Sequence, residues 1–146
     1  MVDTTLPDPD TLSVFQTDEE LGTFWSWIEQ ARANEEAYRA TLRELSSTQL
    51  VRLVWTFKEV EDRLFDVLED LEFEPLLGED ESVSEDRIED FCGWMVVQGR
   101  SQVEQWLADP ESLEAKEDFT KEMGIDARYM AEEEYRERHG DGPPTY

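Results

Sequence analysis

Glu61 is the residue of this sequence whose position best suits acid–base chemistry. It lies beside an apolar helical stripe that contains Phe57, Leu64 and Leu68, and burial against such a stripe moves the pKa of a carboxyl group toward neutrality. The chain carries 38 Asp and Glu residues, however, so carboxylates lie near one another by chance. We therefore interpret Glu61 as an edge residue with a packed stem and a carboxylate in water. A buried Glu61 paired with an arginine is the alternative.

Patterns for metal binding and nucleophilic catalysis are missing. The sequence has one Cys and one His, Cys92 and His139, and two ligands cannot complete a zinc site. Arg136 stands three residues before the histidine, which excludes the Glu-x-x-His pair of di-iron bundles. The acidic run at 79–81 lacks the alternating Asp and the glycine of an EF-hand. Cys92 falls on an apolar helix face, where we expect a buried thiol. We predict no catalytic residue, no metal and no cofactor.

Binding of a partner or ligand is the remaining possibility. Aromatic residues away from the main apolar faces are candidates for such binding. Trp27 and Trp94 lie to the side of the stripes on their helices. Such tryptophans are either second-core residues or exposed binding anchors, and we favour the core. Arg100 either forms an ion pair with the acid-rich middle of the chain or faces a ligand, and we favour the ion pair. The candidate partner-facing or ligand-facing residues are Trp27, Trp94, Gln98, Arg100 and Glu61.

Capping patterns and apolar spacing predict that helices position these residues. Thr17 with Glu20 forms a capping box before a helix over 18–33, and Asn34 can cap a second helix that reaches about residue 45. Another capping box at Ser46 opens the strongest apolar stripe of the chain. That stripe consists of Leu50, Leu53, Val54, Phe57, Val60, Leu64, Val67, Leu68 and Leu71.

The second half of the chain predicts a central apolar helix followed by shorter elements. Residues 84–98 become apolar almost all round, which is typical of a buried helix. A short helix after Gly99, a weak helix after Asp109-Pro110 and a last helix capped by Asp126 follow. No segment shows the alternation of a strand. We predict an all-α, single-domain bundle of about six helices, in which a long helix (48–72) packs on the central helix (84–98).

The predicted organisation has three parts. Residues 1–16, with two of the six prolines, form an extended N-terminal arm whose Leu12, Val14 and Phe15 can contact the core. Residues 17–139 form the helical domain. Residues 140–146, which contain two glycines and two prolines, form a flexible C-terminal tail.

Three sequence blocks resemble a bacterial family catalogued as domain of unknown function 4240. The blocks are FWSWIEQAR at 24–32, FCGWMVVQGR at 91–100 and ADPESL at 108–113. The resemblance covers roughly residues 24–113 and implies a helical bacterial domain, without an activity. Two features differ from the family pattern. Cys92 replaces an arginine, and residues 69–86 are rich in Glu and Asp and lack paired glycines.

The charge balance limits the partners. With 13 Lys and Arg against 38 Asp and Glu, the net charge is -25, and 15 acidic against two basic residues lie between positions 59 and 90. Nucleic-acid backbones and anionic membranes are poor partners for such a chain. No apolar run is long enough for a membrane span, and the acidic N-terminus does not resemble a signal peptide. We expect a soluble, cytoplasmic protein with a protein partner.

Three classes of function stay open. The first is a non-enzymatic protein-interaction or regulatory module, which we favour because no catalytic pattern is present. The second is an acidic inhibitor, immunity protein or DNA mimic, which requires the acid between positions 59 and 90 to form one face. The third is an enzyme with an unfamiliar site, which requires a pocket that gathers Glu61, Arg100 and a tryptophan.

Overall fold

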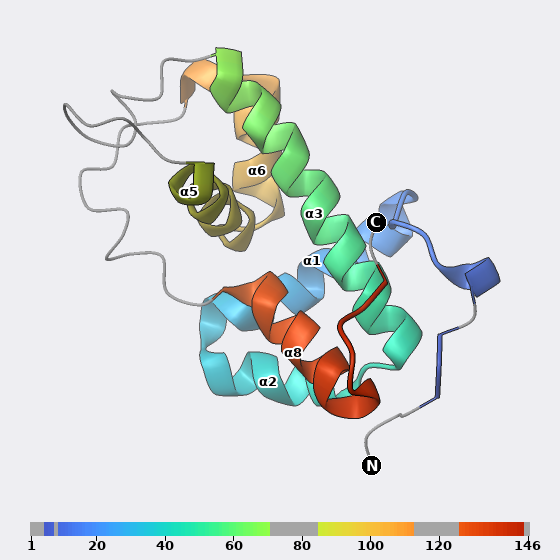
Figure 1. The fold of residues 1–146 in the computed structure, drawn as a ribbon. Helices are drawn as coiled ribbons and strands as arrows, with labels where there is room; N and C mark the ends of the chain where they lie inside the picture. The colour runs from blue at the N-terminus through green and yellow to red at the C-terminus, as the bar shows by residue number, and fades with distance from the viewer. Residues whose placement is uncertain (1–4, 8, 71–84, 113–125, 145–146) are drawn as a thin grey trace.

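The chain folds into a bundle of α-helices, seen in a computed structural model that describes residues 5–7, 9–70, 85–112 and 126–144 (Figure 1). In the described residues the α-helices are α1 (Asp18–Ala33), α2 (Glu35–Glu44), α3 (Ser47–Asp70), α5 (Glu85–Val97), α6 (Arg100–Ala108) and α8 (Ala127–His139). Two single 3-10 turns, η1 (Pro9–Thr11) and η2 (Pro110–Ser112), complete these elements. The part described contains no strand, and the prediction of an all-α bundle is confirmed.

The predicted caps begin the helices. The Thr17 hydroxyl accepts from the Glu20 backbone N–H, and the Glu20 carboxylate accepts in return from the Thr17 backbone N–H. Asn34 caps α2 through a 2.7 Å bond from the Ala37 backbone. Each cap satisfies a backbone N–H that has no partner within its helix, so local sequence fixes where the helix starts.

Two further caps follow the same rule. Ser46 and Gln49 form the second capping box, at the start of α3. The Asp126 carboxylate accepts from the Tyr129 backbone N–H and begins α8. The weak helix expected after Pro110 is a 3-10 turn as far as Ser112. Its remainder, the acidic run at 79–81 and the expected last turn of the long helix lie outside the described residues.

Helix α3 connects the two halves of the bundle. It packs against α5 and α6 along its C-terminal half and against α8 along its N-terminal half (Figure 1). Helix α1 passes behind α3 in this view and packs against α2 (Figure 1). Its buried residues include Leu50, Leu53, Phe57 and Leu64, and all four are almost inaccessible to solvent. The predicted packing of the long helix on the apolar helix is confirmed, and α8 is a second neighbour that the sequence did not predict.

Both ends of the described chain run back onto α3. Phe15 is buried, its backbone N–H donates to the hydroxyl of buried Thr56 at 2.9 Å, and its ring packs on Trp27 at 5.6 Å. At the other end, residues 140–144 turn away from α8 toward α3 (Figure 1). The indole N–H of Trp55 donates to the Pro144 carbonyl at 2.8 Å. The flexibility of this C-terminal segment stays a prediction.

Candidate functional site

Two adjoining hollows lie between α3 and α8. The first, which we call the inner cleft, has a volume of about 160 Å³ and is lined by Lys58, Glu61, Asp62, Phe65, Cys92 and Arg128. The second, which we call the outer groove, has a volume of about 440 Å³ and is lined by Val54, Trp55, Lys58, Arg128, Glu132, Arg136, Gly142, Pro143 and Pro144. Because Lys58 and Arg128 line both hollows, the inner cleft opens beside the outer groove.

Glu61 is the buried acid of the inner cleft. Its side chain is only 9% exposed, and Arg128 Nη1 lies 3.1 Å from its Oε1 atom. The two atoms form an ion pair without hydrogen-bond geometry, so Oε1 accepts no hydrogen bond within the described structure. Our interpretation of Glu61 as an edge residue with its carboxylate in water was therefore wrong. The alternative, a buried Glu61 paired with an arginine, matches the structure.

Burial determines the proton affinity of Glu61. Loss of solvent raises the pKa of its carboxyl group from 4.5 to about 7, although Arg128 and Lys58 favour the charged form. A buried carboxylate keeps its charge only where cations and hydrogen bonds replace the lost water, and here the replacement is incomplete. Gly93 approaches from α5, where a Cβ atom would lie 3.8 Å from Oε2. The inner cleft therefore holds an acid that can gain or lose a proton near neutral pH.

The outer groove combines aromatic, proline and cationic walls. Arg128, Glu132 and Arg136 follow one another at intervals of four residues, so they form one row along α8. Trp55 and Lys58 face them from α3. The C-terminal segment forms the third wall, and Arg136 Nη2 lies 3.4 Å from the position that a Cβ atom of Gly142 would take. The outer groove therefore brings together an indole ring, two prolines, three cationic side chains and one carboxylate.

Trp27 and Trp94 are core residues. Trp27 is 9% exposed and contacts Phe15, while Trp94 is 7% exposed and stacks between Phe91 at 5.5 Å and Trp106 at 6.1 Å. Their assignment as candidate partner-facing residues needs correction, because so little of either ring reaches the surface. The interpretation as second-core residues, which we favoured, agrees with these contacts.

Gln98 and Arg100 connect helices and do not line either hollow. The Gln98 side chain donates to the Trp94 backbone carbonyl, and the Gln98 backbone carbonyl accepts from Arg32 on α1. Arg100 pairs with Glu104 and with Asp18, and both carboxylates raise the pKa of its guanidinium group. Neither partner belongs to the acidic stretch 59–90 with which we expected the pair, and the side chains of 69–90 lie outside the description. The enzyme hypothesis requires a pocket that gathers Glu61, Arg100 and a tryptophan. The inner cleft contains Glu61 but neither Arg100 nor a tryptophan.

Two further groups with reactive side chains are enclosed. Cys92 is 2% exposed, as expected for a core thiol, although it contributes to the wall of the inner cleft. The Ser47 hydroxyl lies 2.8 Å from Nε2 of His139, a distance typical of a nucleophile and its base. Ser47 is completely buried at the start of α3, however, so a substrate cannot reach its hydroxyl. This pair fastens α8 to α3.

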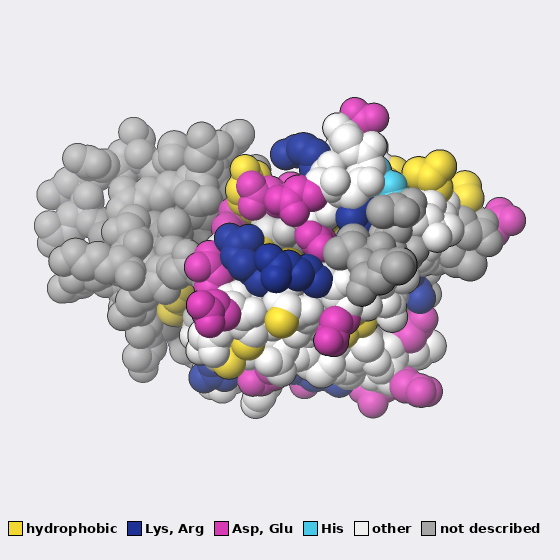
Figure 2. Space-filling view, turned by 90° about the horizontal axis from the view of Figure 1, so that it is seen from below, with side chains coloured by type: hydrophobic (Ala, Val, Ile, Leu, Met, Phe, Trp, Pro, Cys, Tyr) yellow, Lys and Arg dark blue, Asp and Glu magenta, His cyan; other side chains and the backbone are white. Residues whose placement is uncertain are grey.

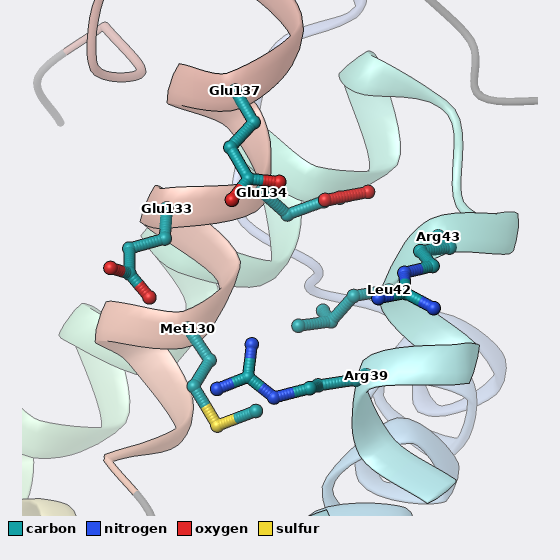
Figure 3. A pocket seen from close by; sticks show the side chains of 7 residues that line it. All are labelled: Arg39, Leu42, Arg43, Met130, Glu133, Glu134 and Glu137. Atoms are coloured by element: carbon teal, nitrogen blue, oxygen red, sulfur yellow. The ribbon is translucent and has the colours of Figure 1, made fainter. Parts of the chain in front are cut away.

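A separate shallow pocket of about 60 Å³ lies between α2 and α8. Figure 2 views the molecule from the side of these two helices and shows Lys and Arg side chains closely bordered by Asp and Glu. In Figure 3, Arg39 and Arg43 extend from α2, and Glu133, Glu134 and Glu137 extend from α8. Arg39 already pairs with Glu35, and Glu134 with Arg138. Each of these ion pairs lies within one helix, and α8 is joined to the end of α2 by Arg138, which donates to the Leu42 and Leu45 carbonyls. We assign no ligand to this small pocket.

Most residues that line the inner cleft and the outer groove were not predicted from the sequence. Glu61 was a candidate, but Lys58, Arg128, Arg136 and Trp55 were not. The eight-residue spacing of Arg128 and Arg136, which places them on one face of a helix, was visible in the sequence. It gained meaning only when α8 was found beside α3.

Comparisons with known proteins give a family and no activity. A sequence model described as "Protein of unknown function (DUF4240)" matches residues 19–137. The match confirms the predicted resemblance and extends it on both sides. No curated protein and no solved structure matches the chain. In the described part of the chain, no helix is long and apolar enough to cross a membrane. Among the same residues, no three His, Cys, Asp or Glu side chains are grouped to hold a metal ion.

Proposed function

The chain belongs to the DUF4240 family, and we propose that it is a non-enzymatic interaction module that binds an extended acidic segment of a partner protein in the outer groove. The observation that carries this proposal is a cationic surface on a chain with a net charge of -25. Lys58, Arg128 and Arg136 line the outer groove against one carboxylate, Glu132. Such a local excess of positive charge favours a ligand that brings carboxylates.

Two of these cations, Lys58 and Arg136, are accessible to a partner. Lys58 pairs with Asp62 at 3.2 Å, but both side chains are about half exposed, at 42% and 54%. Exposed pairs of this kind contribute roughly 0.3–0.5 kcal/mol, so a partner carboxylate can replace Asp62 at little cost. Arg136 is exposed at the edge of the groove.

The apolar walls support an extended segment of polypeptide. Trp55, Pro143 and Pro144 form a rigid surface at which little side-chain entropy is lost on binding. The chain's own residues already demonstrate one such contact, since the Trp55 indole holds the main-chain carbonyl of Pro144. Aromatic residues beside prolines are a recurring way of holding extended peptides. A cytoplasmic location and a protein partner, both expected from the sequence, are part of this proposal.

A peptide titration of the full-length protein tests the proposal. The probe is a capped tetrapeptide with one glutamate on each side of a leucine-proline core, and the matched peptides replace both glutamates by glutamine or by lysine. We expect calorimetry to detect binding of the glutamate peptide, at least about tenfold weaker binding of the glutamine peptide, and none of the lysine peptide. Affinity should also fall as salt is raised.

Charge reversal identifies the surface. Arg136→Glu should raise the Kd of the glutamate peptide by about tenfold or more, whereas Arg63→Glu should leave this Kd within about twofold of the wild-type value. Arg63 is a suitable control because it lies on α3, is 65% exposed and does not line the outer groove. Equal binding of the three peptides, no binding of any of them, or an unchanged Kd in Arg136→Glu would each disprove the proposal.

A further inference from the structure

The Glu61 carboxylate, which contains an oxygen without a hydrogen bond, lies at the inner cleft. Glu61 lines the cleft, and its Oε1 atom is buried and accepts no hydrogen bond within the described structure. A buried acceptor without a hydrogen bond lowers stability substantially, so native proteins retain such groups where water or a ligand completes them. The cleft has a volume of about 160 Å³, well above the roughly 10–15 Å³ that one water molecule needs by this measure. It therefore has room for a small chemical group.

The charges around the inner cleft indicate which kind of chemical group can bind there. A carboxylate would face Glu61 and Asp62, and an ammonium or guanidinium would face Lys58 and Arg128. An apolar group would fit beside Phe65 and Cys92 but would leave Oε1 without a donor. A neutral group that both donates and accepts hydrogen bonds avoids all three penalties.

We propose that the inner cleft is a subsite for a primary carboxamide, whose N–H group donates to Glu61 Oε1 and whose carbonyl oxygen accepts from Lys58 or Arg128. Its aliphatic stem lies against Phe65 and Cys92, which supply the apolar part of the wall. In proteins this group is the end of an asparagine or glutamine side chain.

The position of the subsite connects it with the outer groove. Because the two hollows share Lys58 and Arg128, a segment in the outer groove can place one side chain into the inner cleft. The identification of the ligand as a side chain of the partner rests on the proposed function. Recognition of a carboxamide by the cleft does not, and it can be measured separately with small molecules.

Four compounds of nearly equal size test this recognition in the full-length protein. Propionamide donates and accepts hydrogen bonds, 2-butanone only accepts, propionate is an anion and propylammonium is a cation. The readout is the backbone amide signal of Gly93, which lies on α5 beside Glu61 Oε2, together with those of Cys92 and Phe65. At pH 8 most Glu61 is charged, since its pKa is about 7. We expect propionamide to shift these signals in a saturable way and the other three compounds to shift them at least about tenfold less.

Two isosteric variants locate the interaction. Glu61→Gln should raise the Kd of propionamide by about tenfold, because a hydrogen bond to a charged oxygen is stronger than one to a neutral oxygen. Glu132→Gln should bind propionamide like the wild type. Glu132 lies 3.6 Å from the same Arg128 guanidinium but lines only the outer groove. Thermal melts establish that both variants are folded before titration.

The outcomes separate the subsite from the proposed function. Equal shifts by all four compounds, no shift by propionamide, or unchanged binding in folded Glu61→Gln would overturn the subsite. Selective propionamide binding that depends on Glu61 supports it, even if the glutamate peptide fails to bind the outer groove. If the peptide does bind, adding one glutamine to either end should tighten its binding to the wild type and not to Glu61→Gln.

Discussion

Oε1 of Glu61 lies 3.1 Å from Nη1 of Arg128, and this buried pair joins the middle of α3 to the first turn of α8. The carboxylate is 9% exposed, whereas the guanidinium is 27% exposed and also approaches Glu132. The acid therefore loses more hydration than the base. This asymmetry explains why burial outweighs two neighbouring cations in setting the pKa of Glu61.

The first prediction concerns the dependence of stability on pH. The pKa of Glu61 is about 7 in the folded protein and 4.5 in the unfolded chain, so the folded state holds the proton more tightly. The resulting stabilisation is fully present below about pH 4.5 and is lost as pH rises through 7. Relative to Glu61→Gln, the wild type should lose about 3 kcal/mol of unfolding free energy between pH 4.5 and 8. Urea unfolding of both proteins across this range measures the difference.

Asp62→Asn is the matched control for this effect. Asp62 is the next residue on α3 and is 54% exposed, so its removal should give a nearly constant difference from the wild type over the same range. Parallel pH profiles for the wild type and Glu61→Gln would contradict the assignment of Glu61 as the titrating group.

The helices could be predicted from the sequence because their signals are local. A cap such as Thr17 or Asn34 acts on backbone groups within three residues, and the stripe on α3 repeats at helical spacing. Helix α1 accordingly has the predicted bounds. The surroundings of Glu61 could not be predicted in this way. Whether its face is covered depends on α8, and sequence spacing does not say which helix covers which face.

The tryptophans show a second limit of sequence patterns. Trp27 and Trp94 lie to the side of the main stripes, yet both are buried. Phe15 from the N-terminal segment packs on Trp27, and Phe91 and Trp106 stack on Trp94. An angle on a single helix cannot distinguish a second-core residue from a surface anchor. Trp55 is the tryptophan that lines a hollow, and its partner Pro144 is contributed by a distant part of the chain.

The second prediction compares Trp94 with Arg100. Trp94→Ala removes a 7% exposed ring from a stack of three aromatic residues and should cost roughly 3–5 kcal/mol of unfolding free energy. Arg100→Ala breaks ion pairs in which the arginine side chain is 32% exposed and should cost roughly 0–1 kcal/mol. Thermal and chemical melts give both values. A Trp94→Ala protein that melts like the wild type would show that this tryptophan does not belong to the core.

The third prediction concerns Arg138, whose side chain is only 1% exposed. Its guanidinium donates to the carbonyls of Leu45 at 2.7 Å, Leu42 at 2.9 Å and Arg43 at 3.2 Å, and so satisfies the carbonyls at the end of α2. Arg138→Met retains the packing of the stem but leaves these acceptors without the guanidinium. We expect a loss of roughly 2–4 kcal/mol in chemical unfolding.

Arg136→Met, two residues earlier on the same helix, is the control for Arg138→Met. Arg136 is exposed, so this change should alter stability by no more than about 0.5 kcal/mol. Equal effects of the two substitutions would mean that the carbonyl contacts of Arg138 are unimportant for stability.

The fourth prediction concerns the contact between Trp55 and Pro144. Trp55→Phe keeps an aromatic ring but removes the N–H group that donates to the Pro144 carbonyl. We expect faster motion of Gly142 in ¹⁵N relaxation measurements and an almost unchanged melting temperature, because the contact lies at the surface. Unchanged relaxation of Gly142 would show that the hydrogen bond does not hold the C-terminal segment. Trp106→Phe, a change in the core, should leave Gly142 unaffected as long as the protein is folded.

The fifth prediction follows from the net charge of -25. Mutual repulsion among the carboxylates destabilises the compact state, and it extends further at low salt, where the screening length grows from about 8 Å at 0.15 M to about 30 Å at 0.01 M. Salt also weakens local ion pairs such as Lys58–Asp62, but an exposed pair contributes only roughly 0.3–0.5 kcal/mol. Repulsion should therefore dominate, and the melting temperature should rise as sodium chloride is increased from 0.01 to 0.15 M. Choline chloride should have the same effect at equal ionic strength, because screening depends on charge rather than on ion identity. A melting temperature that falls with added salt would mean that attractive pairs outweigh the repulsion.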